Sequence, residues 1–383
     1  MCDKNINKKT NINNFLYIKN IMSIPDCTLV TACYDLSRFN DNCRKLEDSI
    51  KNMDSLLKTP CYLVIFTDNI LYEKVYNIRN GYGLNHLTMY VTKEIEELNI
   101  YKYIDIVKSN REKYHPTKDA RTCPESHLIC CSKFDFVLEI IYKNPFNTSK
   151  FGWIDSNVGV NFSKICTDYK NNMLLNVLDN ATEKFHIQIL NVQEQKFKKT
   201  ENLREYYEKY RWVVCGCLFV TGKKIGIKIL NDLNSVVMKH TMLGYGHGEE
   251  MFYLEILDKH YNDIVRSYGE YNTIINNLVK LTTGINYIYS VIMLRYLQYK
   301  CYKECIVCCE QVISAYDSYA IEMEYDIYFN TYFTLYLATY YVDVRKAKDI
   351  VNKIFELAEK NPYFKKEFNK NKNYYYEQFK YVM

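Results

Sequence analysis

The sequence predicts an α/β protein in which a mixed, mostly parallel β-sheet is flanked by helices and followed by an all-α helical-hairpin domain. Continuous apolar runs at Cys27–Leu36, Cys61–Thr67 and Leu87–Val91 predict strands that are buried on both faces. The stretches between these runs have helical spacing, and this alternation is typical of a parallel sheet with covering helices. After about residue 273 the strand signal almost disappears, and amphipathic helical patterns continue along the rest of the chain.

The chain has 383 residues, which is long enough for two domains. We predict a flexible tail over residues 1–24, a ligand-binding α/β domain over residues 25–272 and a helical domain over residues 273–383. In the helical domain, Tyr302–Cys305 and Arg345–Ala347 begin helices in a pattern similar to the tetratricopeptide hairpin. Their separation exceeds the usual repeat of about 34 residues. We expect these helices to pack on the α/β domain or to bind a protein partner.

The composition excludes several classes of protein. Hydrophobic residues make up 48% of the chain and predict a folded core, and a net charge of +5 does not call for a nucleic-acid partner. The cysteines lie in apolar runs, as expected of reduced thiols. A polar start predicts no secretory signal, and no run approaches the ~18 apolar residues of a membrane helix. We therefore predict a cytoplasmic protein without a membrane span. Abundant Asn, Lys and Tyr indicate an AT-rich genome, such as that of a protist, a bacterium or a large DNA virus.

The segment Lys150–Val160 contains the first candidate site. An apolar strand that includes Trp153 runs directly into Asp155, Ser156 and Asn157. Carboxylate and carbonyl oxygens are the ligands that Mn²⁺ or Mg²⁺ prefers, and such ions keep open positions for a phosphate-bearing ligand. This pattern predicts a glycosyltransferase that depends on a metal and a nucleotide sugar, with Asp155 and Asn157 at the metal. Because Asp, Ser and Asn are also ordinary turn residues, a simple strand-end turn is the other interpretation.

Polar residues also follow the first two predicted strands at their carboxyl ends, where parallel sheets bind their ligands. Tyr34, Asp35 and Arg38 follow the first strand, and Asp68 follows the second. This order predicts that they lie on the same rim of the sheet as the candidate metal ligands. We expect Tyr34 and Asp68, together with Thr31 of the first strand, to hold a nucleoside. All five are candidate nucleotide-binding residues.

A lysine interrupts an otherwise apolar helix. Pro124 suits the first turn of this helix, which we predict to run to about Tyr142, and Lys133 lies among its apolar positions. Such a lysine usually extends its charged end into solvent. If the helix leads toward the candidate metal site, Lys133 instead meets a phosphate as a point charge.

A glycine-rich loop before two glutamates is the second candidate site. Glycines surround His247, and Glu249 and Glu250 then open a helix. Carboxylates in a first helical turn suit the helix dipole without any chemistry. His247 is a possible third metal ligand, since imidazole can bind Mn²⁺, and a structural role is the other interpretation. Gly216, within a predicted strand over Trp212–Val220, indicates close approach of a ligand or another backbone.

Three segments, in their order and spacing, resemble the bacterial HtrL/YibB group, a glycosyltransferase-like family. They are Thr28–Asp35, Phe151–Asp155 and Gly246–Tyr253, and Ser132–Phe134 is a fourth point of similarity. The likeness covers about residues 27–272. It implies a GT-A fold, a nucleotide-sugar donor and a divalent metal. Many GT-A enzymes carry Asp-x-Asp where this chain has Asp-x-Asn, which leaves the strength of metal binding open.

The predicted chemistry is the departure of a diphosphate, whose growing negative charge a metal and fixed donors would stabilise. We expect Ser156 to line the nucleotide site and Lys133 to neutralise phosphate, with a UDP-sugar as the favoured donor. The acceptor is an unknown glycan or protein. An inverting enzyme needs a base for the acceptor proton, and either Glu249 or Glu250 is our candidate.

Two other functions compete with this hypothesis. A non-catalytic GT-A-like scaffold would recruit partners through its helical C-terminal domain, and Asn157 in place of a second carboxylate favours it. A nucleotidyltransferase would have a similar sheet and metal site. The loop Asp35–Asn40 after the first strand has no glycine, which counts against a nucleotidyltransferase because such an enzyme often has a glycine-rich phosphate loop there.

Overall fold

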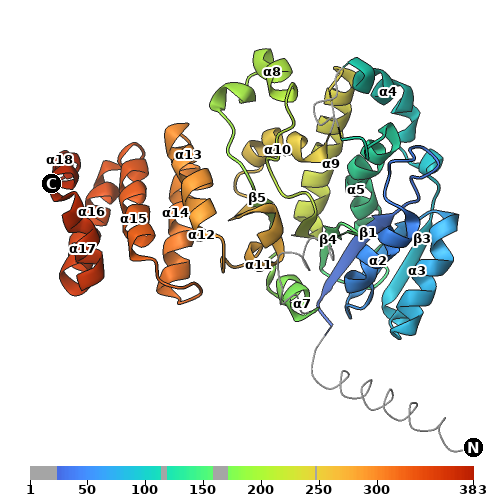
Figure 1. Cartoon of the computed structure of the whole chain (residues 1–383), viewed down its shortest axis with the longest axis horizontal. Coiled ribbons are helices and arrows are strands. Elements are labelled where there is room, and N and C mark those ends of the chain that lie inside the picture. The colour runs from blue at the N-terminus through green and yellow to red at the C-terminus, as the bar shows by residue number, and fades with distance from the viewer. Residues whose placement is uncertain (1–23, 114–118, 158–170, 246–247) are drawn as a thin grey trace, which may run out of the picture.

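A computed structural model describes residues 24–113, 119–157, 171–245 and 248–383. Its centre is a seven-stranded sheet with the strand order β3-β2-β1-β4-β6-β5-β7 (Figure 1). Strand β6 pairs antiparallel with β4 and β5, and the other pairs are parallel, so the predicted mixed, mostly parallel sheet is confirmed. The strands are β1 (Cys27–Cys33), β2 (Tyr62–Thr67), β3 (Thr88–Thr92), β4 (Lys150–Ile154), β5 (Phe185–Ile189), β6 (Leu218–Gly222) and β7 (Ile264–Tyr268).

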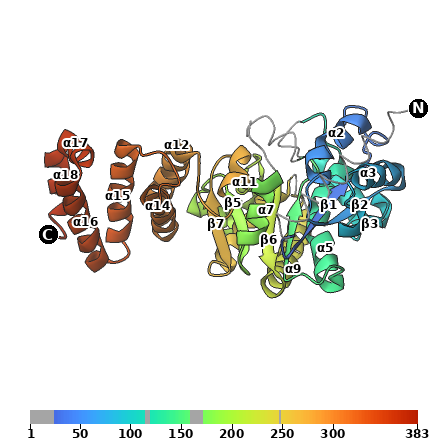
Figure 2. The ribbon, with the colours of Figure 1, turned by 90° about the horizontal axis from the view of Figure 1, so that it is seen from below.

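Helices cover both faces of the sheet. Helices α5 and α9 pack on one face and on each other, while α2, α3, α7 and α11 pack on the opposite face (Figure 2). Both faces of β1 and β2 are therefore buried, which explains their uninterrupted apolar sequences. The helices of this region are α2 (Leu46–Leu57), α3 (Asn69–Gly81), α4 (Ile104–Lys113), α5 (Pro124–Lys143), α7 (Asn171–Asn180), α8 (Leu203–Tyr207), α9 (Lys223–Met242), α10 (Tyr253–Lys259) and α11 (Ile274–Asn277).

Two predicted elements are wrong in their extent. The strand predicted over Trp212–Val220 begins only at Leu218, because the chain turns at Gly216 and Cys217. Helical spacing over Ile95–Val107 predicts a helix there, but the segment is split into short 3₁₀ turns, and the regular helix α4 starts only at Ile104. In both segments most of the apolar residues are buried although the backbone is irregular, so their spacing does not reveal the local backbone conformation.

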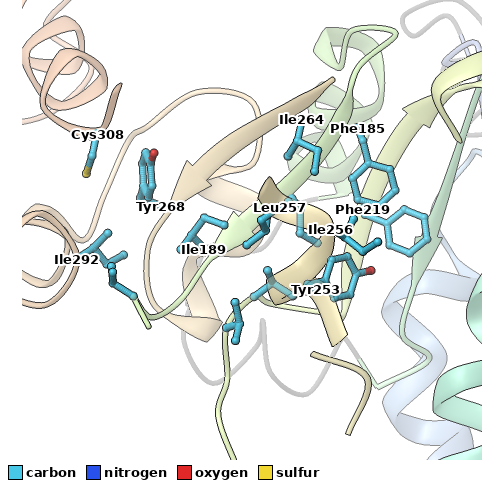
Figure 3. Close-up of a cluster of buried hydrophobic side chains, with 14 of the residues drawn as sticks. Phe185, Ile189, Phe219, Tyr253, Ile256, Leu257, Ile264, Tyr268, Ile292 and Cys308 are labelled. Atoms are coloured by element: carbon cyan, nitrogen blue, oxygen red, sulfur yellow. The ribbon is translucent and has the colours of Figure 1, made fainter. Parts of the chain in front are cut away.

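The C-terminal part of the chain is helical, as predicted, and it packs directly against the sheet edge at β7. In Figure 3, Tyr268 of β7 faces Ile292 and Cys308 of the C-terminal helices. Gln311 Nε2 also donates to the carbonyl of Arg266 in β7 at 2.7 Å. These contacts cover a strand edge that would otherwise be open to pairing.

The C-terminal helices stand in a row that leads away from β7, with α14, α15 and α16 as antiparallel neighbours (Figure 1). A π-helical turn over Ile288–Met293 joins α12 to α13. No helix among the described residues is long and apolar enough to cross a membrane. The helices are α12 (Ile285–Tyr287), α13 (Leu294–Gln298), α14 (Tyr302–Asp317), α15 (Tyr325–Tyr340), α16 (Val344–Lys360), α17 (Pro362–Lys370) and α18 (Lys372–Phe379).

Candidate active site

Two adjoining pockets lie beyond the carboxyl ends of β1 and β4. The first, which we call the β1 pocket, has a volume of about 330 Å³ and includes Tyr34, Arg44 and Ser156 in its wall. The second, which we call the acidic pocket, has a volume of about 650 Å³ and includes Glu249 and Glu250. The two pockets share a wall, whose residues are Asp119, Thr122, Ser126, Cys130 and Asp155.

Asp155 is fixed at the end of β4 by its neighbours. Its backbone N–H donates to the carbonyl of Cys217 at 2.8 Å, and the indole Nε1 of Trp153 donates to Asp155 Oδ1 at 2.5 Å. Its side chain is still 32% exposed. Ser156 and Asn157 form a turn immediately after it, and both line the β1 pocket. The segment is thus a strand-end turn and also a pocket wall, so the two interpretations of its sequence are compatible.

Lys133 lies at the centre of the acidic groups. Its Nζ atom lies 2.5 Å from Glu249 Oε1, 3.0 Å from the carbonyl oxygen of Gly216 and 3.5 Å from Asp155 Oδ1. The side chain is only 1% exposed, so the interpretation that Lys133 points to solvent is wrong. Burial favours a neutral lysine, but the nearby carboxylates outweigh it and hold the pKa of Lys133 well above its usual value. Lys133 is therefore a fixed positive charge next to the wall between the pockets.

The structure separates the two glutamates that the sequence left equivalent. Burial favours the protonated form of Glu249, but its ion pair with Lys133 dominates and lowers its pKa. Glu250 instead accepts a hydrogen bond from the hydroxyl of Tyr210. Burial and the neighbouring charge of Glu249 raise the pKa of Glu250 to about 8. A carboxyl group with this pKa can take a proton from a ligand near neutral pH.

Gly216 allows this arrangement because it has no side chain. A Cβ atom at this position would lie 2.8 Å from Glu249 Oε1. The sequence predicted close approach of a ligand or another backbone at Gly216. The group that approaches Gly216 is the carboxylate of Glu249. The backbone carbonyl of Gly216 accepts a hydrogen bond from Lys133 Nζ.

The oxygens at the end of β4 fit the corner of a divalent-metal site. The Oδ1 atom of Asn157 is buried and has no hydrogen-bond partner among the described residues, while Asp155 offers a partly exposed carboxylate. Mg²⁺ and Mn²⁺ are often held by one or two protein oxygens together with water and phosphate. The described part of the chain has no group of three or more His, Cys, Asp or Glu residues that could hold a metal. His247, the predicted third ligand, lies outside the described residues.

The predicted nucleotide-binding residues divide into two groups. Tyr34, Lys133 and Ser156 line the β1 pocket, and the hydroxyl of Tyr34 has no partner in the described ranges. The remaining four, which are Thr31, Asp35, Arg38 and Asp68, do not line either pocket.

Local contacts explain where three of these four residues lie. The carboxylate of Asp68 caps α3 through Leu71 N at 2.9 Å and accepts from Asp35 N at 2.6 Å. Arg38 pairs with Glu96 at 2.9 Å on the protein surface. The fourth, Thr31, is fully buried within β1. Ligand binding by these four residues stays a prediction.

Several pocket residues were not among the predicted site residues. Arg44 and Arg121 line the β1 pocket. Arg121 pairs with Asp119 at 2.8 Å, whereas Arg44 has no hydrogen-bond or ion-pair partner in the described segments. Tyr210 and Trp212 line the acidic pocket. The position of Arg44, shortly after the first strand, was a usable signal. The other three lie in connections whose course depends on the tertiary fold.

Comparison with solved structures finds ten matching chains, one of which is from the mouse. This is the crystal structure of mouse xyloside xylosyltransferase 1 in its apo form, with 10% sequence identity and a TM-score of 0.34. The alignment covers 62% of this chain and 84% of the mouse chain. No curated protein sequence matches the chain.

The family comparison is more extensive. The family model described as "Bacterial protein of unknown function (HtrL_YibB)" matches residues 25–245, which is more than half of the 383 residues. The match includes β1, β4, Lys133 and the wall between the two pockets. The chain belongs to the HtrL/YibB family.

Proposed function

We propose that this protein is a glycosyltransferase that transfers a sugar from a nucleotide sugar, with a UDP-sugar as the favoured donor. The observation that carries the proposal is the position of Asp155 in a wall between two pockets, one with the guanidinium group of Arg44 and the other with a carboxyl group of raised pKa. A transfer reaction needs two binding sites that meet at the bond that is broken.

The β1 pocket suits the nucleotide diphosphate. Arg44 and Arg121 offer guanidinium groups for phosphate oxygens, and the ring of Tyr34 offers an apolar surface for the nucleoside. Ser156 and Asn157, whose amide oxygen has no partner among the described residues, line the same pocket. Asp155 and Asn157 would hold Mn²⁺ or Mg²⁺ together with the diphosphate. When bound there, the ion would stabilise the negative charge that develops on the departing diphosphate.

The acidic pocket suits the acceptor. In our proposal an acceptor hydroxyl oxygen attacks the anomeric carbon of the donor, and its proton passes to the carboxylate of Glu250. The bond between the anomeric carbon and the diphosphate breaks, and the electron pair leaves with the diphosphate. Glu249 does not act as the base, because its charge is paired with Lys133. Lys133 holds the wall in place and adds positive charge close to the departing group.

A non-catalytic GT-A-like scaffold is the second candidate function. The observation that favours it is the ion pairing of Lys133 with Glu249 and Asp155, which offsets part of the negative charge of these carboxylates without a metal. Such a protein would keep the pockets as a folded remnant and bind partners through its C-terminal helices.

Release of UDP from a panel of UDP-sugars, measured with and without Mn²⁺, separates these two functions. An enzyme releases UDP from at least one donor, because water can replace the acceptor at low rate. Asp155→Ala should abolish this release, while Asp54→Ala, which changes an exposed carboxylate of α2, should leave it unchanged. If the wild type releases no UDP and its thermal midpoint does not respond to UDP or Mn²⁺, the scaffold function is correct.

A further inference from the structure

The acidic pocket has an exposed aromatic wall beside its candidate base. Trp212 is 51% exposed, whereas Trp153, the other tryptophan of the chain, is 3% exposed. The ring of Trp212 packs edge-on against Tyr210, with ring centroids 4.8 Å apart. The hydroxyl of Tyr210 in turn donates a hydrogen bond to the carboxyl group of Glu250. A large aromatic surface is therefore left open next to the group that would take the acceptor proton.

Trp212 also borders a third pocket, whose lining includes residues of the C-terminal helices. This pocket, which we call the α13 pocket, has a volume of about 270 Å³ and shares Tyr210 and Trp212 with the acidic pocket. Arg295 of α13 and Tyr299 complete its far wall. A ligand that starts at Glu250 and passes over Trp212 thus reaches the helical part of the molecule.

The walls of the α13 pocket carry groups that bind hydroxyls. Asn191, Gln193 and Arg295 contribute amide and guanidinium groups. Asn191 Nδ2 donates to the carbonyl of Trp212 at 3.1 Å, and Arg295 donates to Asn191 Oδ1 at 3.3 Å, so these groups are held in position beside the indole. Rigid aromatic surfaces combined with a few fixed polar groups are typical of sites that orient an amphipathic ligand.

A peptide acceptor fits this surface less well than a sugar chain. Two common modes of peptide binding are an added strand on a free sheet edge and a helix in an apolar groove. The nearest sheet edge, at β7, is covered by the C-terminal helices, and Gln311 binds the carbonyl of Arg266 there. A sugar ring has an apolar face for an indole and hydroxyl groups for amides and guanidinium groups.

We infer that the acceptor is an oligosaccharide that lies across Trp212, from the acidic pocket into the α13 pocket. Its reacting sugar lies beside Glu250, its next sugar stacks on Trp212, and a further sugar contacts Asn191 and Arg295. This inference rests on the proposed glycosyltransferase function. It also gives the C-terminal helices a role, because α13 supplies part of the acceptor site.

An array of immobilised glycans, from mono- to hexasaccharides and both neutral and acidic, tests this inference directly. The wild type should bind longer glycans more tightly than monosaccharides of the same type. Trp212→Ala should weaken that binding by about tenfold or more, and Trp212→Phe should retain most of it. Arg295→Ala should weaken binding of the longer glycans only. Tyr319→Ala, at an aromatic residue that is 90% exposed and outside these pockets, is the matched control.

Tryptophan fluorescence gives a second readout that needs no activity. A glycan identified on the array should change the emission of the wild type, and the change should vanish in Trp212→Phe because Trp153 is buried. The inference is overturned if the wild type binds no glycan, if Trp212→Ala binds glycans as the wild type does, or if only an array of peptides gives binding.

The failure of this inference can be told apart from the failure of the proposed function. Binding of UDP in the β1 pocket does not involve Trp212, so Trp212→Ala should bind UDP with the wild-type affinity. If the wild type releases UDP from a donor but Trp212 variants bind glycans normally, only the oligosaccharide assignment is wrong. If the wild type neither binds UDP nor releases it from any donor, the proposed function itself is wrong.

Discussion

The β1 pocket and the acidic pocket share a wall but differ in the state of their charged groups. In the β1 pocket, Arg44 has no ion-pair partner among the residues described, and the Asn157 oxygen is likewise unpartnered. In the acidic pocket both glutamates already have partners, because Glu249 pairs with Lys133 and Glu250 accepts a hydrogen bond from Tyr210. The first pocket is prepared for a charged ligand, while the second holds its own charges and is prepared for a neutral ligand that gives up a proton.

The largest expected effect comes from breaking the buried pairs of Lys133. Lys133→Met leaves Glu249 buried without its cation, which should lower the free energy of unfolding by about 3–5 kcal/mol. Denaturant unfolding measures this change. The double variant Lys133→Met with Glu249→Leu should recover much of the loss. Lys228→Met removes an exposed pair with Asp263 and should change stability by at most about 0.5 kcal/mol. If Lys133→Met and Lys228→Met lose the same amount of stability, the ion pairs of Lys133 are not buried ones.

A smaller loss should follow from adding one methyl group at Gly216, next to Glu249. Gly216→Ala places a Cβ atom 2.8 Å from Glu249 Oε1, so the glutamate and lysine must shift, at a cost of about 1–3 kcal/mol. Thermal unfolding measures this loss. Gly81→Ala is the matched control, because a Cβ atom there would meet nothing within 4 Å. An unchanged stability of Gly216→Ala would mean that Glu249 is not closely packed against Gly216.

The two pockets should respond differently to the loss of one cation. Arg44→Ala removes a phosphate-binding group from the β1 pocket and should weaken UDP binding by about tenfold, which corresponds to roughly 1.4 kcal/mol. Glycan binding in the acidic pocket should stay the same. Calorimetric titration with UDP measures the first quantity. A variant that binds UDP as tightly as the wild type would remove Arg44 from the proposed donor site.

The smallest expected effect concerns the pH dependence of the acidic pocket. Donor turnover needs the deprotonated form of Glu250, so the rate should rise with pH through a pKa of about 8. The Tyr210 hydrogen bond lowers this pKa, so Tyr210→Phe should move the rise to higher pH, by less than about one unit. A pH–rate profile measures the shift, and an unchanged profile would exclude Glu250 as the base.

The same group makes stability depend on pH. The pKa of Glu250 is raised in the folded state, so its contribution to stability is fully present below about 4.5 and is lost as pH rises toward about 8. Glu250→Gln should flatten this decline. Unfolding curves between these pH values provide the measurement, and an equal decline in both proteins would contradict the raised pKa.

The sequence was sufficient to predict the sheet and the position of Asp155 at its rim, but not the ion pair between Lys133 and Glu249. Strands β1 and β2 are apolar on both faces, so their sequences show directly that they are central strands. The polar residues that follow β4 then mark the ligand-binding rim.

The position of Lys133 required the tertiary fold. Helix α5 is buried on most of its surface, so the spacing of its apolar residues does not define a solvent face. Its partner Glu249 lies 116 residues away in the sequence. The sequence also did not predict that Trp212 is exposed. Trp212 begins an apolar segment that leads into a turn, and such a segment has the same spacing as a buried strand.

Calorimetric titration of UDP in the presence of Mn²⁺ into the wild type, Asp155→Asn and Glu250→Gln tests the division between the pockets most directly. Asp155 would hold the diphosphate through a metal, whereas Glu250 belongs to the acceptor side. We therefore predict that Asp155→Asn loses UDP binding and that Glu250→Gln binds UDP as the wild type does. Equal loss in both variants, or no loss in either, would contradict the account.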